Sequence, residues 1–584
     1  MRIFKWHYLG LLASLGWLSS LVTLGTSYND LTSLEKRVVD KGLKRYGLRP
    51  VADPLSKVVK EIFILTESPF DEGAGFFTIF NSIHINSRER VIRGFVLQKT
   101  NAVYDPSAVR DSEYLLRSLR AVRCLAVIIP VERLGDTDDS RVSLLVATRD
   151  IFSLQPSFDF SGFGKTLTEL TLGIGVHNLF GYNKSLDATY DLDQATHSFS
   201  LRYFDPELFS SPLRLTLAPS LLFNRDGFGY AGLKGRFKLE RPLLFEADPF
   251  GYGIDLSYGS IPIVDFSGAH VREVEIPMSD GLHRFLHRYR WRYGNNLLHG
   301  RYSMGRTYKK EISFGYGLNI KKPAIPKGLE LTRAERAVFI EKVLPKDEVE
   351  SFVTVGFDYF HNHFLTLSDL NTYNLQENIR LGPYFQISSD LASSHVLFST
   401  HSFIRARMKY SFVQKLYKDS FISISMSSAD RYDGQFSDDV YKFGANYSSH
   451  RLAGLGRLIM DLRLSTSYGN RDNNRFVLGS GSGVRGVESR FYSGEKGFRA
   501  NFEFRSSPIE LLMFNAGLVL FYDVGAAFDR FADANATHAL GLGFRVLAPQ
   551  VSSIPFRFDL AFPIYGVGRK YHAVVPSFGS GQAF

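Results

Sequence analysis

The sequence LGSGSGVRGVESRFYSGEKGFRANFEFRSS, residues 478–507, changes character halfway along. Its first half is dense in glycine, which lets a chain turn tightly and approach other backbone closely. Its second half alternates. Asn501 and Glu503 would lie on one face of a strand, and Phe502 and Phe504 would lie on the other. This stretch therefore predicts a loop followed by a β-strand with one polar face and one aromatic face.

The same alternation recurs through residues 151–584. In residues 288–293 three arginines alternate with aromatic residues, and in residues 556–561 Arg557 and Asp559 alternate with apolar ones. Segments of about ten residues in this style, separated by Gly, Asn, Asp and Pro, are typical of transmembrane β-barrels. A soluble β-sandwich or propeller is the alternative, but it would expose the aromatic faces to water. We therefore predict a mostly β chain that forms an antiparallel transmembrane barrel.

The composition agrees with a barrel and excludes several other classes of protein. The 584 residues include 50 Phe, 29 Tyr and 50 Gly, and 69 Lys and Arg against 59 Asp and Glu leave a net charge of +10. Cys124 is the single cysteine, so a disulfide scaffold is excluded. An apolar content of 44% is too high for a disordered chain. After residue 24 no apolar run is long enough to cross a bilayer as a helix.

The first 26 residues have the features of an export signal. Arg2 and Lys5 precede a mostly apolar run over residues 8–24, and small residues follow at the expected cleavage point. We predict a secretory signal peptide over residues 1–26. An uncleaved anchor is the alternative, which the serines and the glycine inside the apolar run disfavour.

Residues 27–57 are predicted to form a linker that contains a basic helix. Residues 31–48 hold five Lys and Arg against two acidic residues, and their apolar residues are spaced as on a helix. Such a charged run is most often simply a solvated face. The sharper alternatives are contact with anionic lipid headgroups and occupation of a pore.

Residues 58–150 are predicted to form a small α+β unit in the order β-α-α-β-β. Asn86 with Glu89 can cap the first helix, and Asp105 followed by Pro106 begins the second. The strands are expected at residues 57–66, 122–131 and 142–148, and the first helix at residues 86–95.

The barrel is expected to occupy residues 151–584 with 16 strands, from a count of alternating segments that lies between 16 and 20. One segment departs from the alternation. Residues 333–344 predict a helix, because Thr332 and Glu335 form a capping box and Pro345 stops it. We place this helix in a long external loop.

Several short motifs between residues 58 and 584 resemble one known family. Val484-Arg485-Gly486 resembles the inward-folded loop motif of the outer-membrane protein assembly and two-partner-secretion superfamily, and Phe521-x-Asp523-x-Gly525 is similar to its strand motif. Val487 stands where that family has an aromatic residue, a departure that bears on the packing of the loop. Three further short segments resemble motifs of this family: residues 178–181, 204–206 and 581–584.

The resemblance implies a location and a domain. Barrels of this family lie in the outer membrane of Gram-negative bacteria and are preceded by polypeptide-transport-associated (POTRA) domains in the periplasm. The order of elements predicted for residues 58–150 is that of one such domain. The resemblance therefore implies a single periplasmic POTRA domain before the barrel.

Strand alternation alone also assigns several side chains to the lumen. Phe521, Asp523 and Gly525 share one face of their strand, and the residues between them suit lipid. Glu503 is expected to point inward in the same way. The lumen of the predicted barrel therefore receives two carboxylates from neighbouring segments.

The glycine-dense loop, which includes Gly486, can fold back into a lumen and deliver Arg485 to these carboxylates. The planar guanidinium group matches the fork of a carboxylate. We expect Arg485 to pair with Asp523, with Glu503 as a second acceptor, and so to anchor the loop inside the barrel. An ordinary lumen salt bridge with no mechanical role is the alternative.

Two other patterns suggest chemistry that the sequence does not support. Residues 481–486 match G-x-G-x-x-G, but that fingerprint binds a dinucleotide only between a strand and a helix, and alternating strand sequence follows here. His361 and His363 lack a nearby third ligand for a metal ion. We therefore expect no cofactor, no metal site and no enzymatic activity.

The seam between the first and last barrel strands is expected to be weak. Pro156 lies in the predicted first strand, and Pro576, Gly579 and Gly581 lie in the last, before Phe584. Each proline removes a ladder donor, and glycine weakens a strand. In the resembling family such a seam opens laterally so that a client strand can pair with its edge. The alternative is that these residues only mark strand ends and fit the closure.

Taken with the resemblance, these features predict a translocase or insertase that assists assembly or translocation of client polypeptides without nucleotide energy. Its partners would be outer-membrane client polypeptides and the lipid bilayer, with accessory periplasmic proteins left open, and no nucleic acid. Two alternatives remain. One is a dedicated secretion pore plugged by the basic helix, although two transport-associated domains would be usual there. The other is a passive porin-like channel or surface adhesin, which would not need residues 27–150.

Overall fold

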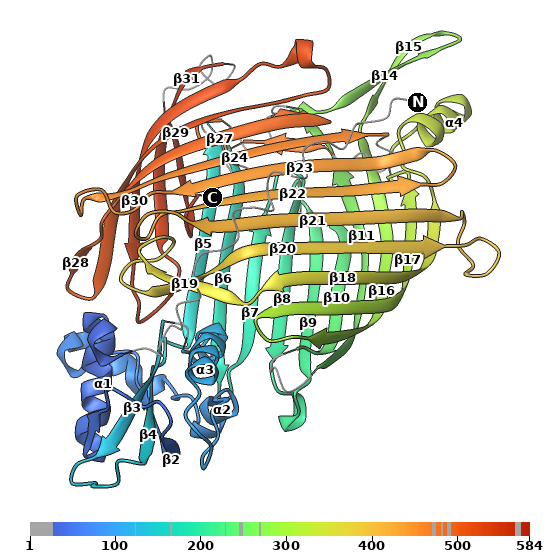
Figure 1. Ribbon diagram of the computed structural model, residues 1–584. Helices are drawn as coiled ribbons and strands as arrows, with labels where there is room; N and C mark the ends of the chain where they lie inside the picture. Colours follow the sequence, from blue (N-terminus) through green and yellow to red (C-terminus); the bar gives the residue numbers. More distant parts are fainter. Residues whose placement is uncertain are drawn as a thin grey trace. The chain divides into compact units, whose positions relative to one another are not determined.

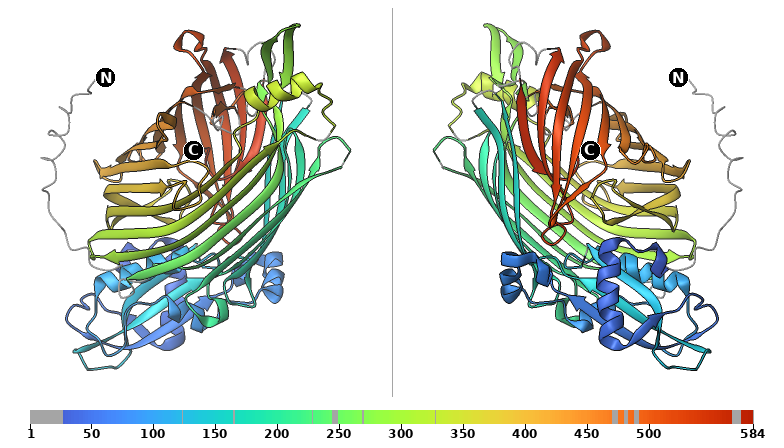
Figure 2. Two further views of the ribbon diagram at one scale, coloured as in Figure 1. Left: turned by 90° about the vertical axis from the view of Figure 1, so that its right-hand side faces the viewer. Right: turned by 90° about the vertical axis from the view of Figure 1, so that its left-hand side faces the viewer.

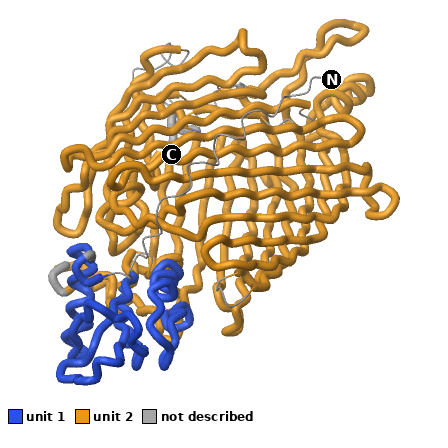
Figure 3. The backbone as a smooth tube through the Cα atoms, in the orientation of Figure 1, with its two compact units in different colours: residues 1–65, 92–116, 126–148 blue, residues 66–91, 117–125, 149–584 orange. Residues whose placement is uncertain are grey.

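The computed structural model describes residues 27–122, 124–163, 166–227, 229–243, 249–267, 270–326, 328–469, 475–479, 483–487, 492–566 and 574–583. The predicted signal peptide lies outside the described residues. The chain divides into two compact units (Figure 3). Unit 1 comprises residues 1–65, 92–116 and 126–148, and unit 2 comprises residues 66–91, 117–125 and 149–584.

The N-terminal part of the chain contains a four-stranded sheet in the order β1-β3-β4-β2. Its central strands β3 and β4 are buried along nearly their whole length, which matches their continuous apolar sequences. The elements in chain order are η1 (Tyr28–Asp30), α1 (Ser33–Tyr46), β1 (Leu48–Pro50), β2 (Val58–Glu67), η2 (Glu72–Ile83), α2 (Glu89–Gly94), α3 (Pro106–Ser118), β3 (Leu125–Arg133) and β4 (Arg141–Arg149).

The predicted basic helix forms as α1 and belongs to unit 1. Thr32 and Glu35 make a capping box at its start, and Gly47 ends it in the left-handed conformation with φ of 64°. Val38 and Val39 are fully buried. A Cβ at Gly42 would lie 2.9 Å from the Leu145 side chain of β4, so the helix packs closely on the sheet. Its apolar face is therefore used inside unit 1.

Between residues 58 and 149 the structure has β2, α2, α3, β3 and β4, in the predicted β-α-α-β-β order. Two elements were not predicted. β1 adds an edge strand to β3, with register from Leu48↔Arg133 to Pro50↔Val131. The 3-10 segment η2 lies between β2 and α2, and residues 66–91 belong to unit 2 together with the barrel strands.

Unit 2 contains a closed antiparallel barrel of 20 strands among the described residues, which corrects the expected 16 (Figure 1). Two strands are interrupted: β18 and β19 pair with β20 in one register, and β27 and β28 both pair with β29. The count from sequence was too low because many connections are very short, such as residues 512–513. Polar faces rich in Ser, as in FISISMSSADRY of β22, also weaken the alternation.

The barrel strands follow one another around the ring, each pairing with its neighbours in the chain. They are β5 (Leu154–Phe163), β6 (Thr166–Leu179), β7 (Lys184–Leu192), β8 (Thr196–Asp205), β9 (Arg214–Asn224), β10 (Tyr230–Arg241), β11 (Phe250–Val264), β16 (Arg288–Met304), β17 (Tyr308–Ala324), β18 (Glu348–His361), β19 (His363–Ser368), β20 (Gln376–Ala392), β21 (Phe403–Lys415), β22 (Phe421–Tyr432), β23 (Phe436–Ser448), β24 (Gly456–Tyr468), β27 (Lys496–Ser506), β28 (Ile509–Leu511), β29 (Phe514–Phe528), β30 (Thr537–Leu547), β31 (Phe556–Tyr565) and β32 (Val575–Ser580).

Additional elements decorate one rim of the barrel, which we call the α4 rim. The predicted helix is α4 (Arg333–Lys342), and its capping box between Thr332 and Glu335 is present. It packs against the hairpin of β14 (Glu273–Met278) and β15 (Gly281–Leu286) around Phe285 and Phe339 (Figure 2). β12 (Phe266–Ser267) and β13 (His270–Val271) belong to the same connection as this hairpin, and η5 (Phe531–Asp533) belongs to the β29–β30 connection. η3 (Leu208–Ser210) belongs to the β8–β9 connection, at the other rim.

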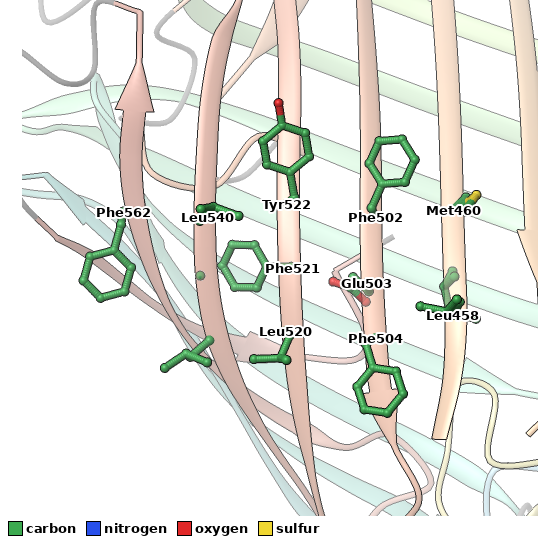
Figure 4. Close-up of a pocket in the computed structure, with 13 residues that line it drawn as sticks. Leu458, Met460, Phe502, Glu503, Phe504, Leu520, Phe521, Tyr522, Leu540 and Phe562 are labelled. Atoms are coloured by element: carbon green, nitrogen blue, oxygen red, sulfur yellow. The ribbon is translucent and has the colours of Figure 1, made fainter. Parts of the chain in front are cut away.

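The barrel wall has an apolar outer face and a polar inner face. In β29, Leu518 and Leu520 are half exposed, whereas Phe521 and Asp523 are buried. Figure 4 shows the outer face of this region, where side chains of Phe502, Leu520 and Tyr522 project from neighbouring strands around a shallow hollow. The alternation read from the sequence therefore places side chains on the sides expected.

The helices of the described residues are short. None has the length and apolar content needed to cross a bilayer.

Candidate functional site

The loop between β24 and β27 folds into the barrel lumen and has a small apolar core of its own. Leu478, Val484 and Val487 are buried together and pack against Phe476 and Tyr492. Those two aromatic residues belong to the short strands β25 (Phe476–Leu478) and β26 (Tyr492–Gly494), which pair with each other. Val487 is fully buried, so valine fills the position where an aromatic residue was expected. The loop residues 480–482 and 488–491 lie outside the described part of the chain.

Arg485 is the centre of the site. Its Nε donates to Oδ2 of Asp523 over 2.7 Å, and its Nη2 donates to Oδ1 of the same carboxylate over 2.8 Å. Its Nη1 forms an ion pair with Oε1 of Glu503 at 2.8 Å. The guanidinium carbon lies 3.4 Å from the centre of the Phe521 ring, a cation–π contact. The structure therefore brings together Arg485, Glu503, Phe521 and Asp523 as the sequence suggested.

Glycines make room for this arrangement. A Cβ at Gly486, where φ is 92°, would lie 3.0 Å from Cβ of Ala539 in β30. A Cβ at Gly525 would lie 2.9 Å from the Val484 side chain. The loop therefore approaches the wall as closely as it does because both positions lack a side chain.

Sequence reasoning missed part of the site, which extends to two further strands. Asp559 of β31 accepts from Nη1 of Arg545 over 2.7 Å and lies 3.4 Å from Nη1 of Arg485. Arg505 of β27 pairs with Glu503 over 2.8 Å. The amide of Asn501 donates to the Gly483 carbonyl and to Asp523. Alternation within a strand could assign these side chains to the lumen. Their position beside Arg485, however, depends on the register between neighbouring strands, which the sequence does not reveal.

The core of the cluster lies away from water. Three arginines, at positions 485, 505 and 545, meet three carboxylates, at positions 503, 523 and 559, and each of these residues is at most 4% exposed. Arg557, whose side chain is 17% exposed, adds a fourth guanidinium group 3.6 Å from Asp559. Removing one partner would leave a buried charge unpaired, which costs more than the pair contributes. Such an arrangement can fix the position of the loop, because any other position of the loop would leave several buried charges without partners.

A second ionic cluster lies on another part of the inner wall and provides a comparison. Arg431 of β22, 2% exposed, pairs with Glu348 and Glu350 of β18. Arg405 of β21 pairs with Glu350 over 2.8 Å. These residues all belong to barrel strands, so this cluster joins strands of the wall to one another.

One hairpin leaves the wall and enters the lumen. The residues of β20 that precede Gly382 do not pair with β21, because the last pair between these strands is Gly382↔Val413. On the other side, β18 pairs with β17 only as far as His361. Gly382 has φ of 83°, a left-handed conformation that produces a bend. Residues 363–381, which we call the strap, continue beyond this bend as a two-stranded hairpin.

The strap contacts lumen-facing residues of strands that are distant in sequence. Arg505 of the ionic cluster donates to the Leu370 carbonyl over 2.8 Å. The amide of Asn374 donates to Glu510 over 3.0 Å and to Asn515 over 2.9 Å. Tyr373, 2% exposed, fills the space left by Gly517, where a Cβ would lie 2.4 Å from its hydroxyl. The strap therefore crosses the lumen beside the Arg485 cluster.

The ring closes between its first and last strands, β5 and β32. In the described part of these strands the register consists of two pairs, Ser577↔Ser161 and Phe578↔Phe160. By comparison, β11 and β16 share 15 pairs. Pro156 lies in β5 below this contact, and Pro576 and Gly579 lie in β32. The seam of the barrel is thus the place where the ring has least backbone pairing.

The end of the chain turns away from the seam after β32. Gly581 has φ of 84° and donates its N–H to the Pro555 carbonyl over 2.8 Å. Gln582 accepts from Nε of Arg545 over 3.0 Å through its side chain. The chain therefore joins the ionic cluster instead of extending the ladder with β5. Phe584, predicted as part of the seam, lies outside the described residues.

Aromatic rings cover the seam on the outside. The ring centre of Phe578 lies 5.0 Å from that of Phe158 and 6.0 Å from that of Phe160, and the second pair is stacked. Aromatic pairs add about 0.5–1.5 kcal/mol each beyond burial. Side chains therefore supply part of the cohesion that the backbone lacks at this point.

No metal centre is found in the part of the chain that the structure describes: no three His, Cys, Asp or Glu residues are arranged to hold an ion. The stacked rings of His361 and His363, 5.4 Å apart, have no third such residue beside them there.

Comparisons with known proteins give structural likenesses only. No family model matches the chain, and no curated protein matches it. A structure of BamA from Haemophilus ducreyi lacking POTRA domains 1–3 is 12% identical, with 94% of this chain and 93% of that chain covered and a TM-score of 0.36. CdiB from Acinetobacter baumannii is 12% identical, with coverage of 94% and 81% and a TM-score of 0.42. CdiB from Escherichia coli is 11% identical, with coverage of 95% and 84% and a TM-score of 0.42. Such low values leave the function to be argued from the chain's own residues.

Proposed function

We propose that this protein is an outer-membrane barrel that inserts or translocates client polypeptides, and that clients use the seam between β5 and β32. The observation that supports this proposal most strongly is that β5 and β32 close the ring with two residue pairs, whereas β11 and β16 share 15. The function needs no nucleotide, metal or cofactor, because it works by exchange of strand pairing. The apolar outer wall supports a location in a bilayer, and the predicted export signal supports the outer membrane.

The free energy of opening supports a role for the seam. A backbone hydrogen bond contributes about 0.5–1.5 kcal/mol net, so two residue pairs cost only a few kcal/mol to separate. Once opened, β5 and β32 would each present unpaired N–H and C=O groups. A client strand could pair with either edge and then leave into lipid, which is strand augmentation used for insertion.

The contents of the lumen favour this lateral route over a path through the barrel. The loop that carries Arg485 and the strap both lie inside the ring, and Arg505 links them. A chain passing through the lumen would have to displace buried ion pairs, which is costly. Passage at the seam would leave the Arg485 cluster in place as a fixed support.

The N-terminal unit is proposed to receive clients as a POTRA-like domain in the periplasm. Its strand β2 is at the edge of the sheet, where residues 101–104 pair with the start of the strand. Farther along, the Tyr46 hydroxyl donates to the Ile64 carbonyl and Arg93 to the Ile62 carbonyl. An extended client segment that paired with this edge would replace these side-chain contacts. The rival secretion pore plugged by the basic helix is less well supported, because α1 buries Val38 and Val39 within unit 1. The passive channel or adhesin leaves the N-terminal unit without a role.

The proposal can be tested with purified protein in proteoliposomes. A urea-unfolded eight-stranded outer-membrane barrel serves as the probe client, and its folding is followed by its heat-modifiable migration on gels. We expect the full chain to accelerate folding over empty vesicles, and a variant lacking the described residues of unit 1, at 27–65, 92–116 and 126–148, to lose that acceleration. Steady ion conductance in planar bilayers without any acceleration would instead support the channel.

A further inference from the structure

The segment η2 presents an apolar surface to its surroundings. Phe76 is 75% exposed, Ile79 59% and Ile83 68%. The eleven residues from 73 to 83 contain no charged side chain. Isolated exposed apolar residues are common on proteins, but a contiguous group of this kind marks a surface that is covered by something.

The opposite side of η2 is packed, so its conformation is fixed. Phe80 contacts Phe152 with ring centres 5.4 Å apart, and Phe70 lies 5.9 Å from Phe152. Asn81 accepts from the Phe70 N–H and donates to the Phe70 carbonyl through its side chain. The packing of Phe80 on Phe152 therefore holds the segment so that Phe76, Ile79 and Ile83 remain exposed.

The residues after η2 are tied to the base of the first barrel strands. The buried Asp150 carboxylate accepts from the Ser87 N–H over 2.6 Å and pairs with Nε2 of His84 at 3.1 Å. Asn178, at the end of β6, donates to the Ile85 carbonyl over 3.1 Å. All of these contacts lie within unit 2. The segment is thus a fixed part of the barrel base.

The contacts also say on which side of the wall η2 lies. The carbonyl of Ser153 accepts from His177, so the ladder of β5 and β6 continues down to this point. Alternation then gives Phe152 the same side as Leu154 and Phe158, which are on the outer, lipid-facing side of β5. Since Phe70 and Phe80 pack on Phe152, η2 lies along the outer side of the base of the seam.

We infer that η2 is an interfacial foot: its Phe76, Ile79 and Ile83 enter the headgroup–acyl boundary of the bilayer at the base of the seam. The observation that selects lipid is continuity, because the exposed face of η2 adjoins the outer surface of β5. Phe and Ile without charged neighbours suit that boundary. This inference rests on the barrel spanning a bilayer and not on the seam opening.

The test places one fluorescent probe on the foot of the full-length protein. In a Cys124→Ala background, Ile79→Cys is labelled with NBD and reconstituted in phosphatidylcholine vesicles that contain doxyl-labelled lipid. Leu542→Cys on the outer face of β30 is the lipid-exposed control, and Asp138→Cys in the β3–β4 connection is the water-exposed control. We expect the emission at position 79 to be blue-shifted and quenched by doxyl lipid to about the extent found at position 542.

Two outcomes would overturn the inference. Quenching by aqueous iodide equal to that at position 138 would mean that the segment is in water. Protection from both iodide and doxyl lipid would mean that protein covers it, either unit 1 or a second copy. Heat-modifiable migration of each variant confirms that the barrel is folded before it is measured, and Phe76→Cys gives an independent site.

Discussion

The seam and the opposite wall of this barrel are made from the same kind of strand but are joined very differently. β11, β16 and β17 run for 15 to 17 residues, and β16 shares 15 residue pairs with β11 and 15 with β17. In the described residues β5 and β32 share two. The wall is held by its backbone, whereas the seam depends on a few aromatic rings and on a chain end turned into the lumen.

This difference fits the proposal that one junction of an otherwise continuous ring opens. Backbone ladders repeat along every strand and are hard to weaken in one place without shortening a strand. β32 has only six residues and contains Pro576 and Gly579. β32 pairs with β31 over six residues and with β5 over two, so the proposed opening would be concentrated at the junction with β5.

The largest expected effect comes from locking the seam. In a Cys124→Ala background, Phe160→Cys with Phe578→Cys places a disulfide across a paired position of β5 and β32. Oxidation should abolish acceleration of client folding, and reduction should restore it, because an open state that is already rare becomes inaccessible.

The matched control is a lock in the opposite wall. Ile254→Cys with Leu298→Cys joins a paired position of β11 and β16 and should leave activity unchanged in both redox states. Full activity with the seam locked would show that clients pass through the lumen, and would favour the secretion pore.

A smaller effect is expected from the centre of the ionic cluster. Arg485→Ala leaves Glu503 and Asp523 without a partner that contacts both. Breaking a desolvated pair costs about 2–5 kcal/mol, and because each member of this cluster is at most 4% exposed we expect a cost within that range. Arg485→Ala should clearly reduce the acceleration of client folding and the protection of the 475–494 loop from proteolysis. It should lower the urea midpoint of the barrel only slightly.

Arg431→Ala is the contrasting variant, because its partners Glu348 and Glu350 belong to the wall. It should lower the urea midpoint and leave the loop protected. If both variants have the same profile, the Arg485 cluster is an ordinary lumen salt bridge with no special relation to the loop.

Removing the strap should open space in the lumen and leave the strand pairing of the wall unchanged. Replacing residues 364–380 with Asn-Gly joins the paired residues His363 and Leu381 by a two-residue turn. We expect ion conductance in planar bilayers to rise several-fold, because the strap occupies the lumen. Deleting the exposed residues 395–398 of the β20–β21 connection should leave conductance unchanged, and an equal rise there would mean that any trimmed loop opens the pore.

The smallest expected effect concerns pH at the α4 rim. A hydrogen bond with Glu335, followed by the nearby Asp280, raises the pKa of His283 above 6.5. The backbone and hydroxyl of Thr332 lower the pKa of Glu335 below 4.5. The histidine contribution is fully present below pH 6.5 and is lost as pH rises through the raised pKa. The Glu335 contribution is present above pH 4.5 and is lost as pH falls through the lowered pKa.

Between these two limits the contact of α4 with the β14–β15 hairpin should therefore be most protected. Hydrogen exchange of residues 333–343, corrected for intrinsic rates, checks this. His283→Gln should remove the loss of protection above pH 6.5, and His395→Gln should not. A pH profile that does not respond to His283→Gln would contradict the prediction.

Much of the inner site could be predicted because its signals are local. Arg485, Asp523 and Glu503 were expected together from a glycine-rich loop and from alternation within single strands. Asp559 and Arg545 were not, because their place beside Arg485 depends on the register of β29, β30 and β31. No local pattern encodes that register.

The strand count and the strap could not be obtained from the sequence for related reasons. Residues 363–381 alternate like any barrel hairpin, and only the loss of pairing partners beyond Gly382 shows that they leave the wall. Short turns and Ser-rich strands such as β22 hid strand boundaries, so 16 strands were expected where there are 20. α4, by contrast, was placed correctly because a capping box is a local signal.

The neighbour-to-neighbour order of the barrel has a consequence for how the ring assembles. Every barrel junction except one joins segments that follow each other in the chain, so hairpins can form early with little loss of loop entropy. The exception joins residues 160–161 to residues 577–578, across nearly the whole barrel sequence, and gains only two residue pairs. During folding the sheet therefore remains open with two free edges until late, and in that interval this chain resembles the unfinished barrels that it is proposed to assist.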